Sequence, residues 1–150
     1  ACFIVASANE RHLAINMTKL QKLLYIAYGT YLAIIGRRLT DEHPQAWPYG
    51  PVFPTTRSRL LKKDLSYIDF SLPILNKIKE DEEMKSLINL VLNGFGNKSA
   101  TTLTVWSHQS GSPWDRIASQ EDFTWGAVIP DEYIKEYFSA IIIRKSNGQQ

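Results

Sequence analysis

The longest regular apolar pattern in the chain runs from residue 20 to residue 35. Its apolar side chains follow the i, i+3, i+4, i+7 spacing of a helix with one buried face. They are Leu20, Leu23, Leu24, Ala27, Tyr31, Leu32 and Ile35. Thr18 and Gln21 match a capping box that would begin this helix, and Gly36 predicts its end. Gly29 lies inside the helix and costs up to about 1 kcal/mol relative to alanine, so we expect another helix to approach closely there.

Similar patterns elsewhere predict a mostly α fold, with one compact domain over residues 1–150 and five to seven helices joined by proline-rich loops. The core is expected to cover about residues 3–142, and the polar residues 144–150 are expected to fray. Further helices are expected over about residues 2–13, 55–64, 75–92 and 100–109, and from Pro130 onwards. Pro54 and Ser99 suit the starts of two of these helices. The acidic run at residues 80–83 could divide residues 75–92 into two shorter helices.

The segments between these helices carry loop signals. Residues 37–54 contain four of the seven prolines, so we expect no regular element there. Residues 65–73 are expected to be irregular or briefly extended, and residues 94–97 to form a turn. The stretch "HQSGSPWDRI", residues 108–117, is expected to be a loop that bends at its glycine and proline.

The composition is that of a globular chain, with 44% hydrophobic and 21% charged residues in 150. A formal net charge of +2 is too small to indicate a polyanionic partner by itself. Cys2 is the only cysteine, which excludes a disulfide within these residues and favours the cytoplasm. No apolar run approaches the roughly 20 residues of a membrane span. The apolar residues 1–6 lack the flanks of a signal peptide, so we interpret them as a helix whose first residues are missing.

Ser107, His108 and Asp115 are the residue types of a hydrolase triad. Adjacent residues on a helix point about 100° apart, so Ser107 and His108 cannot face each other. The chain also has no G-x-S-x-G elbow. We therefore expect no catalytic residues.

Metal and phosphate sites have no better support. The three histidines, His12, His43 and His108, lack the spacing of metal ligands. The acidic cluster at residues 41–43 is more typical of a solvated loop, and Gly94-x-Gly96 lacks the third glycine and the preceding strand of a phosphate cradle. We expect neither a metal nor a cofactor.

The helix expected at residues 55–64 is basic. Its cations and those just upstream are Arg37, Arg38, Arg57, Arg59, Lys62 and Lys63. Such a cluster could contact phosphates, whereas the small net charge favours a solvated helix face. A transcriptional regulator that binds nucleic acid through this helix therefore stays open as a second hypothesis.

The four tryptophans allow two interpretations. Trp47 and Trp114 fall in loops with proline and glycine, Trp106 falls on a helix, and Trp125 lies in a connecting segment. Loop tryptophans commonly pin a loop onto the core, but tryptophan, tyrosine and arginine also dominate binding hot spots. The sequence does not separate the two.

The stretch "AWPYGPVFP", residues 46–54, concentrates this question in one loop. Its prolines fix the path of the chain, and Gly50 allows a turn that a side chain would block. We expect Trp47 to anchor the loop to the core and leave open whether Tyr49 does so or faces a partner.

Two stretches together resemble a known family. The first is "KLQKLLYIAYGTYLAIIGRRLTDEHPQAWPYGPVFP", residues 19–54, and the second contains "PWDRI". The combination resembles the Panacea domain, also described as the SocA-like or phage-associated family. The motif positions in this chain are Lys19, Gln21, Lys22, Tyr25, Gly50, Pro51, Val52, Pro54, Leu103, Ser107, His108, Pro113 and Trp114. The resemblance covers about residues 3–140 and departs from the family pattern at residues 44–45 and 55–57.

The resemblance implies an antitoxin without enzymatic activity. Members of this family neutralise unrelated protein toxins by direct binding, often translation-blocking enzymes such as toxic small alarmone synthetases, and some act as adaptors that deliver a toxin to a protease. The partner expected here is a toxin encoded by the adjacent gene. Candidate partner-binding residues are Trp47, Tyr49, Arg57, Arg59, His108 and Trp114. The identity of the toxin and the oligomeric state stay open.

Overall fold

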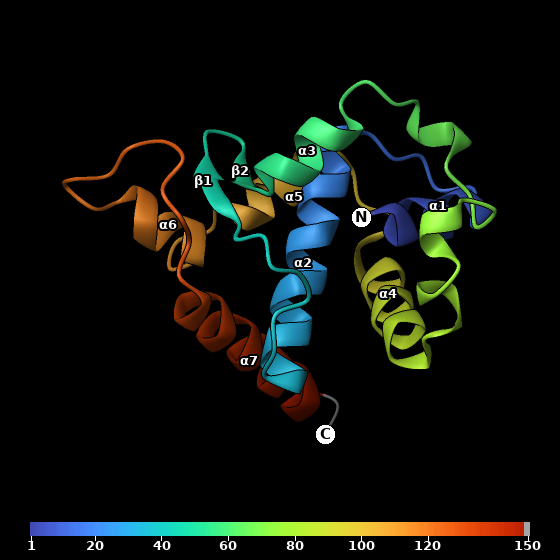
Figure 1. Ribbon diagram of the computed structural model, residues 1–150. Coiled ribbons are helices and arrows are strands. Elements are labelled where there is room, and N and C mark those ends of the chain that lie inside the picture. The colour runs from blue at the N-terminus through green and yellow to red at the C-terminus, as the bar shows by residue number, and fades with distance from the viewer. Residues whose placement is uncertain (149–150) are drawn as a thin grey trace.

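The computed structural model describes residues 1–148 and shows a mostly helical fold (Figure 1). The α-helices in these residues are α1 (Cys2–Glu10), α2 (Met17–Ile35), α3 (Pro54–Leu60), α4 (Glu82–Phe95), α5 (Ala100–Ser107), α6 (Pro113–Ala118) and α7 (Asp131–Asn147). Between α3 and α4 lie three short 3₁₀ helices, η1 (Leu65–Tyr67), η2 (Pro73–Leu75) and η3 (Ile78–Glu80). Two strands, β1 (Gln45–Trp47) and β2 (Gly50–Val52), form an antiparallel hairpin. The expected mostly α architecture of five to seven helices is confirmed.

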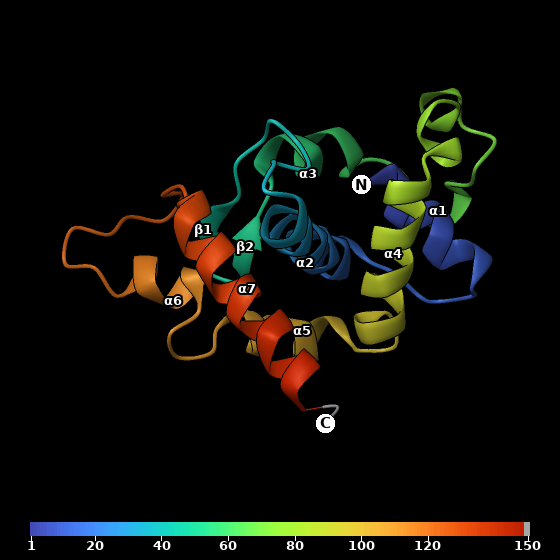
Figure 2. The same cartoon turned by 90° about the horizontal axis from the view of Figure 1, so that it is seen from below.

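The centre of the fold is α2. Figure 2 is viewed nearly along this helix and shows α3, α4, α5, α7 and the hairpin around it. Every residue from 19 to 30 is buried, the polar ones included. A helix buried on all sides needs neighbours on all sides, which explains why the other elements surround it. None of the helices in the described part of the chain is long and apolar enough to cross a bilayer.

The start of α2 differs from the prediction. The helix begins at Met17, and the Asn16 side chain accepts a hydrogen bond from the Lys19 N–H at 2.8 Å. The capping box predicted at Thr18 and Gln21 is therefore wrong, because Asn16 caps the helix and Gln21 bonds the backbone of a distant segment. Asparagine is as good a cap as threonine, so the local pattern contained two candidates.

The two ends of α2 are fixed in different ways, by lysine hydrogen bonds near the start and by a glycine conformation at the end. Near its start, Lys19 Nζ donates to the carbonyl oxygens of Gly96 at 2.6 Å and Ala14 at 3.0 Å. At its end, Gly36 adopts φ +79°, a left-handed conformation that favours glycine, so the predicted end is confirmed.

The last helix, α7, crosses α2 at Gly29. A Cβ atom at Gly29 would overlap the Phe138 ring, so the predicted close approach of another helix is confirmed. Tyr25, one turn earlier in α2, packs edge-on against Phe138 with ring centroids 5.4 Å apart. As predicted, α7 follows Pro130, but it continues to Asn147. The helix thus includes residues 144–147, for which fraying stays a prediction, and residues 149–150 lie outside the described residues.

Residues 37–54 contain the hairpin, although the sequence predicts no regular element there. In its register Ala46 lies opposite Pro51. The Ala46 N–H donates to the Ala127 carbonyl at 2.8 Å and the Ala46 carbonyl accepts from the Gly126 N–H at 2.9 Å. These groups face away from Pro51, so the pairing does not need the N–H that proline lacks.

The segment predicted as a loop at residues 108–117 contains α6. Ser112 caps this helix by accepting from the Asp115 N–H, and Pro113 is its first residue. A serine followed directly by proline, with an acid in the first turn, is a helix start that the loop interpretation overlooked.

Other boundaries shift by a few residues. The first helix ends at Glu10 rather than near residue 13, and α3 begins at Pro54 as predicted but ends at Leu60. The acidic run begins α4, because the Asp81 side chain caps it by accepting from the Met84 N–H. This helix continues through Phe95, where the sequence predicts a turn. The cap predicted at the start of α5 is confirmed, since its serine side chain accepts from a backbone N–H in the first turn.

Candidate protein-binding surface

Two polar side chains of α2 bind the backbone of the hairpin region. Gln21 Oε1 accepts a hydrogen bond from the Phe53 N–H at 2.7 Å. Lys22 Nζ donates to the Pro51 carbonyl at 3.1 Å. Buried main-chain groups need such partners, so the central helix fixes the path of β2 and of the start of α3.

Lys22 lies beneath the hairpin with little electrostatic support. Its side chain is only 1% exposed. Within the described residues its ammonium group bonds the Pro51 carbonyl and no carboxylate. Burial lowers the pKa of Lys22 to about 8, because desolvation disfavours the charged form.

Gly50 lies directly against this lysine. A Cβ atom at Gly50 would be 2.8 Å from Lys22 Cε and 2.6 Å from Ser107 Oγ. Gly50 also adopts φ +107°, a conformation that residues with a side chain rarely adopt. Both the conformation and the space therefore require glycine at this position of the hairpin.

Substituting alanine for Gly50 is expected to destabilise the protein by about 2 kcal/mol, from backbone strain and from overpacking against Ser107 and Lys22. Urea unfolding followed by circular dichroism measures the loss. Gly111→Ala is the matched control, because Gly111 has φ +82° but no atom within 4 Å of its Cβ position. Equal losses in the two variants would contradict the packing assigned to Gly50.

Aromatic and basic side chains come together beside the hairpin. We call this group the aromatic surface and define it as Trp47, Tyr49, Arg57, His108, Trp114 and Trp125. The His108 ring stacks on Trp114, with centroids 3.9 Å apart and planes at 14°. Trp114 Nε1 donates to the Trp47 carbonyl at 2.8 Å, and the Arg57 guanidinium lies 5.5 Å from the centre of the Trp47 ring. Five of the six predicted partner-binding residues thus lie on the hairpin or next to it.

The rings of the aromatic surface differ in exposure. Tyr49, at the tip of the hairpin, is 74% exposed, and Trp125 is 56% exposed. Trp47 and Trp114 are half-buried. The buried core residue of β1 is Ala46, so the expectation that Trp47 anchors the loop in the core is wrong.

Trp125 is the member of this surface that the sequence did not indicate as a partner-binding residue. Residues 126–129 run along the outer edge of β1, where Ile129 N–H donates to the Pro44 carbonyl at 3.0 Å. This pairing brings the Trp125 ring close to the Trp114 ring in a stacked arrangement, with the ring centroids 6.2 Å apart. Gly126, with φ +96°, is the local signal of the turn that makes the approach possible.

The neighbours of His108 show how its ring is held. Nε2 of His108 is buried and has no hydrogen-bond partner among residues 1–148. Burial, with a smaller contribution from the charge of Lys22, lowers the pKa of His108, so the ring is neutral at pH 7. Ser107 Oγ donates to a backbone carbonyl and Asp115 accepts from a backbone N–H, so neither side chain bonds the His108 ring.

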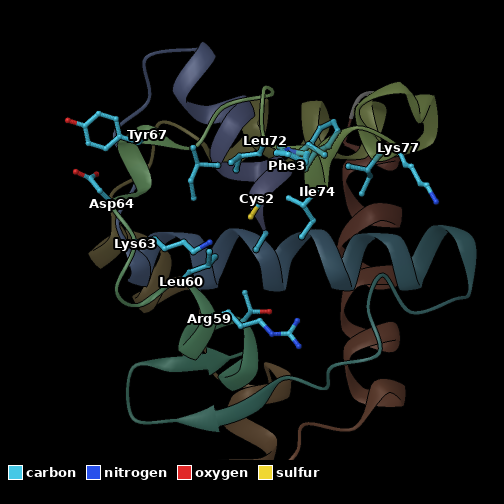
Figure 3. A pocket seen from close by; sticks show the side chains of 16 residues that line it. Cys2, Phe3, Arg59, Leu60, Lys63, Asp64, Tyr67, Leu72, Ile74 and Lys77 are labelled. Carbon is cyan, nitrogen blue, oxygen red and sulfur yellow. The ribbon is translucent and has the colours of Figure 1, made fainter.

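The remaining cations do not gather on one face. Arg59 lines a groove together with Lys63 instead of joining the aromatic surface (Figure 3). Arg37 and Arg38 follow the far end of α2 (Figure 1) and form ion pairs, Arg37 with Glu83 and Arg38 with Asp131. Of the cations in the nucleic-acid hypothesis, Arg57 thus lies in the aromatic surface, Arg59 and Lys63 line the groove, and Arg37 and Arg38 are ion-paired.

The chain is similar to proteins of a known family. Residues 20–115 match the family described as "Antitoxin SocA-like, Panacea domain". The chain is also 34% identical to Antitoxin SocA of Caulobacter vibrioides (strain NA1000 / CB15N) over 152 aligned residues, which cover 92% of this chain and 79% of that protein. It belongs to the SocA-like, Panacea-domain antitoxin family. No solved structure matches it.

In this Panacea-domain protein, the residues that match the family include most of the aromatic surface. The matched residues include nearly all of α2, the hairpin, α3, α5 and the start of α6. They end before Trp125 and α7. The buried Gln21 and Lys22 thus belong to the matched region together with the half-buried Trp47 and Trp114, whereas the exposed Trp125 ring does not.

Proposed function

We propose that this Panacea-domain protein is a cytoplasmic antitoxin that binds and neutralises a protein toxin encoded by the adjacent gene, through the aromatic surface. Its membership of an antitoxin family supports the role. The sequence resemblance implies a translation-blocking enzyme, such as a toxic small alarmone synthetase, as the class of toxin. Antitoxins of this kind act by binding, so the proposal needs no catalytic group.

The observation that carries the choice of surface is the exposure of two large rings on a fixed support. Tyr49 and Trp125 are 74% and 56% exposed. Hydrogen bonds from Lys22 to the hairpin and from Trp114 to Trp47 fix the backbone around Tyr49. Backbone hydrogen bonds between Ala46 and residues 126–127 fix the segment that follows Trp125. Aromatic rings on a rigid support lose little conformational entropy on binding, and tryptophan and tyrosine dominate binding hot spots.

The chemistry of the surface indicates what the toxin must offer. Apolar pockets would receive the two exposed rings, with an acidic or carbonyl-rich rim to pair with Arg57. His108 is expected to act indirectly, because its neutral ring lies stacked on Trp114. It supports the shape of the surface rather than its charge.

The neighbouring gene is expected to stop growth when expressed alone and to be harmless when this protein is co-expressed. Tyr49→Ala and Trp125→Ala are each expected to weaken toxin binding about thirtyfold, the effect of losing a hot-spot contact of about 2 kcal/mol, and to abolish rescue when combined. Growth assays and binding measurements with the purified proteins report the two effects. Tyr67→Ala is the matched control, since Tyr67 is 82% exposed but lies outside the aromatic surface.

Three results would contradict the proposal. A neighbouring gene that is harmless alone removes the antitoxin role. Full rescue by the double variant, with the control behaving identically, removes the aromatic surface from that role. Rescue accompanied by disappearance of the toxin from cells, with no inhibition by the purified protein, would replace direct neutralisation by delivery to a protease.

A further inference from the structure

A groove opens between the start of α1, the end of α3 and the 3₁₀ helices (Figure 3). Its volume is about 830 Å³. The apolar part of its wall includes Phe3, Leu60, Ile68, Leu72, Ile74 and Leu75. Several of these residues also belong to the core, so the hydrophobic core extends to the surface at this place. Ile74 is 75% exposed, a large solvent contact for an isoleucine at the edge of an apolar wall.

Three cations line the same groove. They are Arg59 and Lys63, which come from the end of α3 and the residues after it, and Lys77, which lies on the opposite side of the view, beyond Ile74 (Figure 3). Among residues 1–148, none of their three side chains has an ion-pair or hydrogen-bond partner, although the Lys63 backbone N–H donates to the Leu60 carbonyl. By contrast, Arg37 and Arg38 at the end of α2 both have acidic partners.

One carboxylate, Asp64, lines the groove together with the three cations, and Glu42 is hydrogen-bonded to its wall. The Asp64 side chain accepts from both the N–H and the hydroxyl of Ser66, at 3.0 and 2.6 Å. Glu42 accepts from the N–H of Thr56, a residue of the groove wall, at 3.1 and 3.0 Å. The groove therefore combines an apolar floor with positive charges that lack internal partners.

We propose that this groove binds a small amphipathic carboxylate, with its apolar chain against Leu60, Leu72 and Leu75 and its carboxylate paired with Arg59 and Lys63. Small-molecule sites occupy about 300–1,000 Å³ and combine apolar walls with a few polar groups, as this groove does. One anionic head with a single apolar tail matches a groove whose cations stand beside an apolar floor. The site is separate from the aromatic surface, and its test requires no toxin.

Octanoate and octan-1-ol are suitable probes, because they share a chain length and differ in charge. Chemical-shift titration of the ¹⁵N-labelled full natural chain, with any residues that precede Ala1 in place, is expected to show saturable shifts at residues 60–78 for octanoate. The Arg59→Ala/Lys63→Ala double variant is expected to bind octanoate roughly fivefold more weakly, as for the loss of two exposed ion pairs. Its affinity for octan-1-ol is expected to change less than twofold.

Lys62→Ala is the control, because Lys62 is an exposed cation beside the same helix that does not line the groove. It is expected to bind octanoate as the unsubstituted protein does. Absence of saturable shifts below the micellar concentration would overturn the proposal, as would equal losses of both ligands in the double variant. Binding to phosphatidylglycerol-containing vesicles without binding of octanoate would assign the cations to a lipid surface and would also overturn it.

Discussion

Replacing Phe138 with alanine is expected to destabilise the protein by about 4 kcal/mol, the loss typical of a buried phenylalanine. Phe138 is 3% exposed and lies over Gly29, where α7 crosses the central helix. Its ring also packs against Tyr25 and Trp106, with centroids 5.4 and 6.0 Å away. Urea unfolding followed by circular dichroism measures the loss. Ile143→Ala in the same helix is the control, because Ile143 is 59% exposed, and a similar loss there would contradict the assigned packing.

The same contact predicts a change of sign for alanine at Gly29. In the unsubstituted protein a methyl group would overlap the Phe138 ring, so Gly29→Ala is expected to destabilise by about 1–2 kcal/mol. In the Phe138→Ala background the ring is gone, and the higher helix propensity of alanine is expected to stabilise by up to about 1 kcal/mol. A double-mutant cycle measures this coupling, and additive effects would contradict it.

The fold was predictable where the signal is local. The apolar stripe of α2, its end at Gly36 and the start of α3 at Pro54 follow from the sequence alone, because each depends on neighbouring residues. The need for a close neighbour at Gly29 was also predictable, but its identity as Phe138 was not. That contact joins residues more than 100 positions apart, and the helical spacing of apolar residues does not predict which distant residues meet.

The errors occur where tertiary contacts override local patterns. Gln21 has the type and place of a capping-box residue, yet its side chain oxygen accepts from Phe53 N–H. The proline-rich segment forms a hairpin because Pro51 lies opposite Ala46, whose own N–H bonds residue 127 on the other edge. The sequence around the hairpin does not indicate that residues 126–127 pair with its other edge.

The sequence predicted the types of residue in the aromatic surface, but it did not predict every residue that belongs to it. Trp47 and Trp114 were candidates because loop tryptophans serve either the core or an interface, and the structure brings them together through one hydrogen bond. Trp125 was not singled out as a partner-binding residue, since its approach depends on the pairing of residues 126–129 with β1. Arg59 separates from Arg57, because residues two apart on a helix point in different directions.

Lys22 is expected to contribute a rise of about 2 kcal/mol to the free energy of unfolding between pH 8 and pH 10. The pKa of Lys22 is lowered from 10.5 to about 8 in the folded protein, because the ammonium group is buried beneath the hairpin. Between these values the unfolded chain binds the proton and the folded protein does not. Stability therefore increases with pH in this window, and below pH 8 it stays at its lower level because both states are protonated.

Other groups also titrate in or near this window, among them Lys19, whose pKa is lowered by burial, and their contributions can be subtracted. Burial raises the pKa of Tyr25 and of Tyr28, so their ionisation in the unfolded chain lowers the stability of both proteins equally as the pH approaches 10. Burial lowers the pKa of the amino group of Ala1, which contributes equally to a variant at residue 22. The difference between the unsubstituted protein and Lys22→Met isolates the lysine, because methionine has a similar length and no charge.

Urea unfolding of both proteins at pH 7, 8, 9 and 10 provides the measurement. The difference in unfolding free energy between the two proteins is expected to change by about 2 kcal/mol between pH 8 and pH 10, because all other groups contribute equally to both. Lys135→Met, at an exposed lysine of α7, is expected to keep the profile of the unsubstituted protein. Parallel profiles for the unsubstituted protein and Lys22→Met would mean that Lys22 keeps its ordinary pKa, and hence that its amine reaches water and does not support the hairpin from within the core.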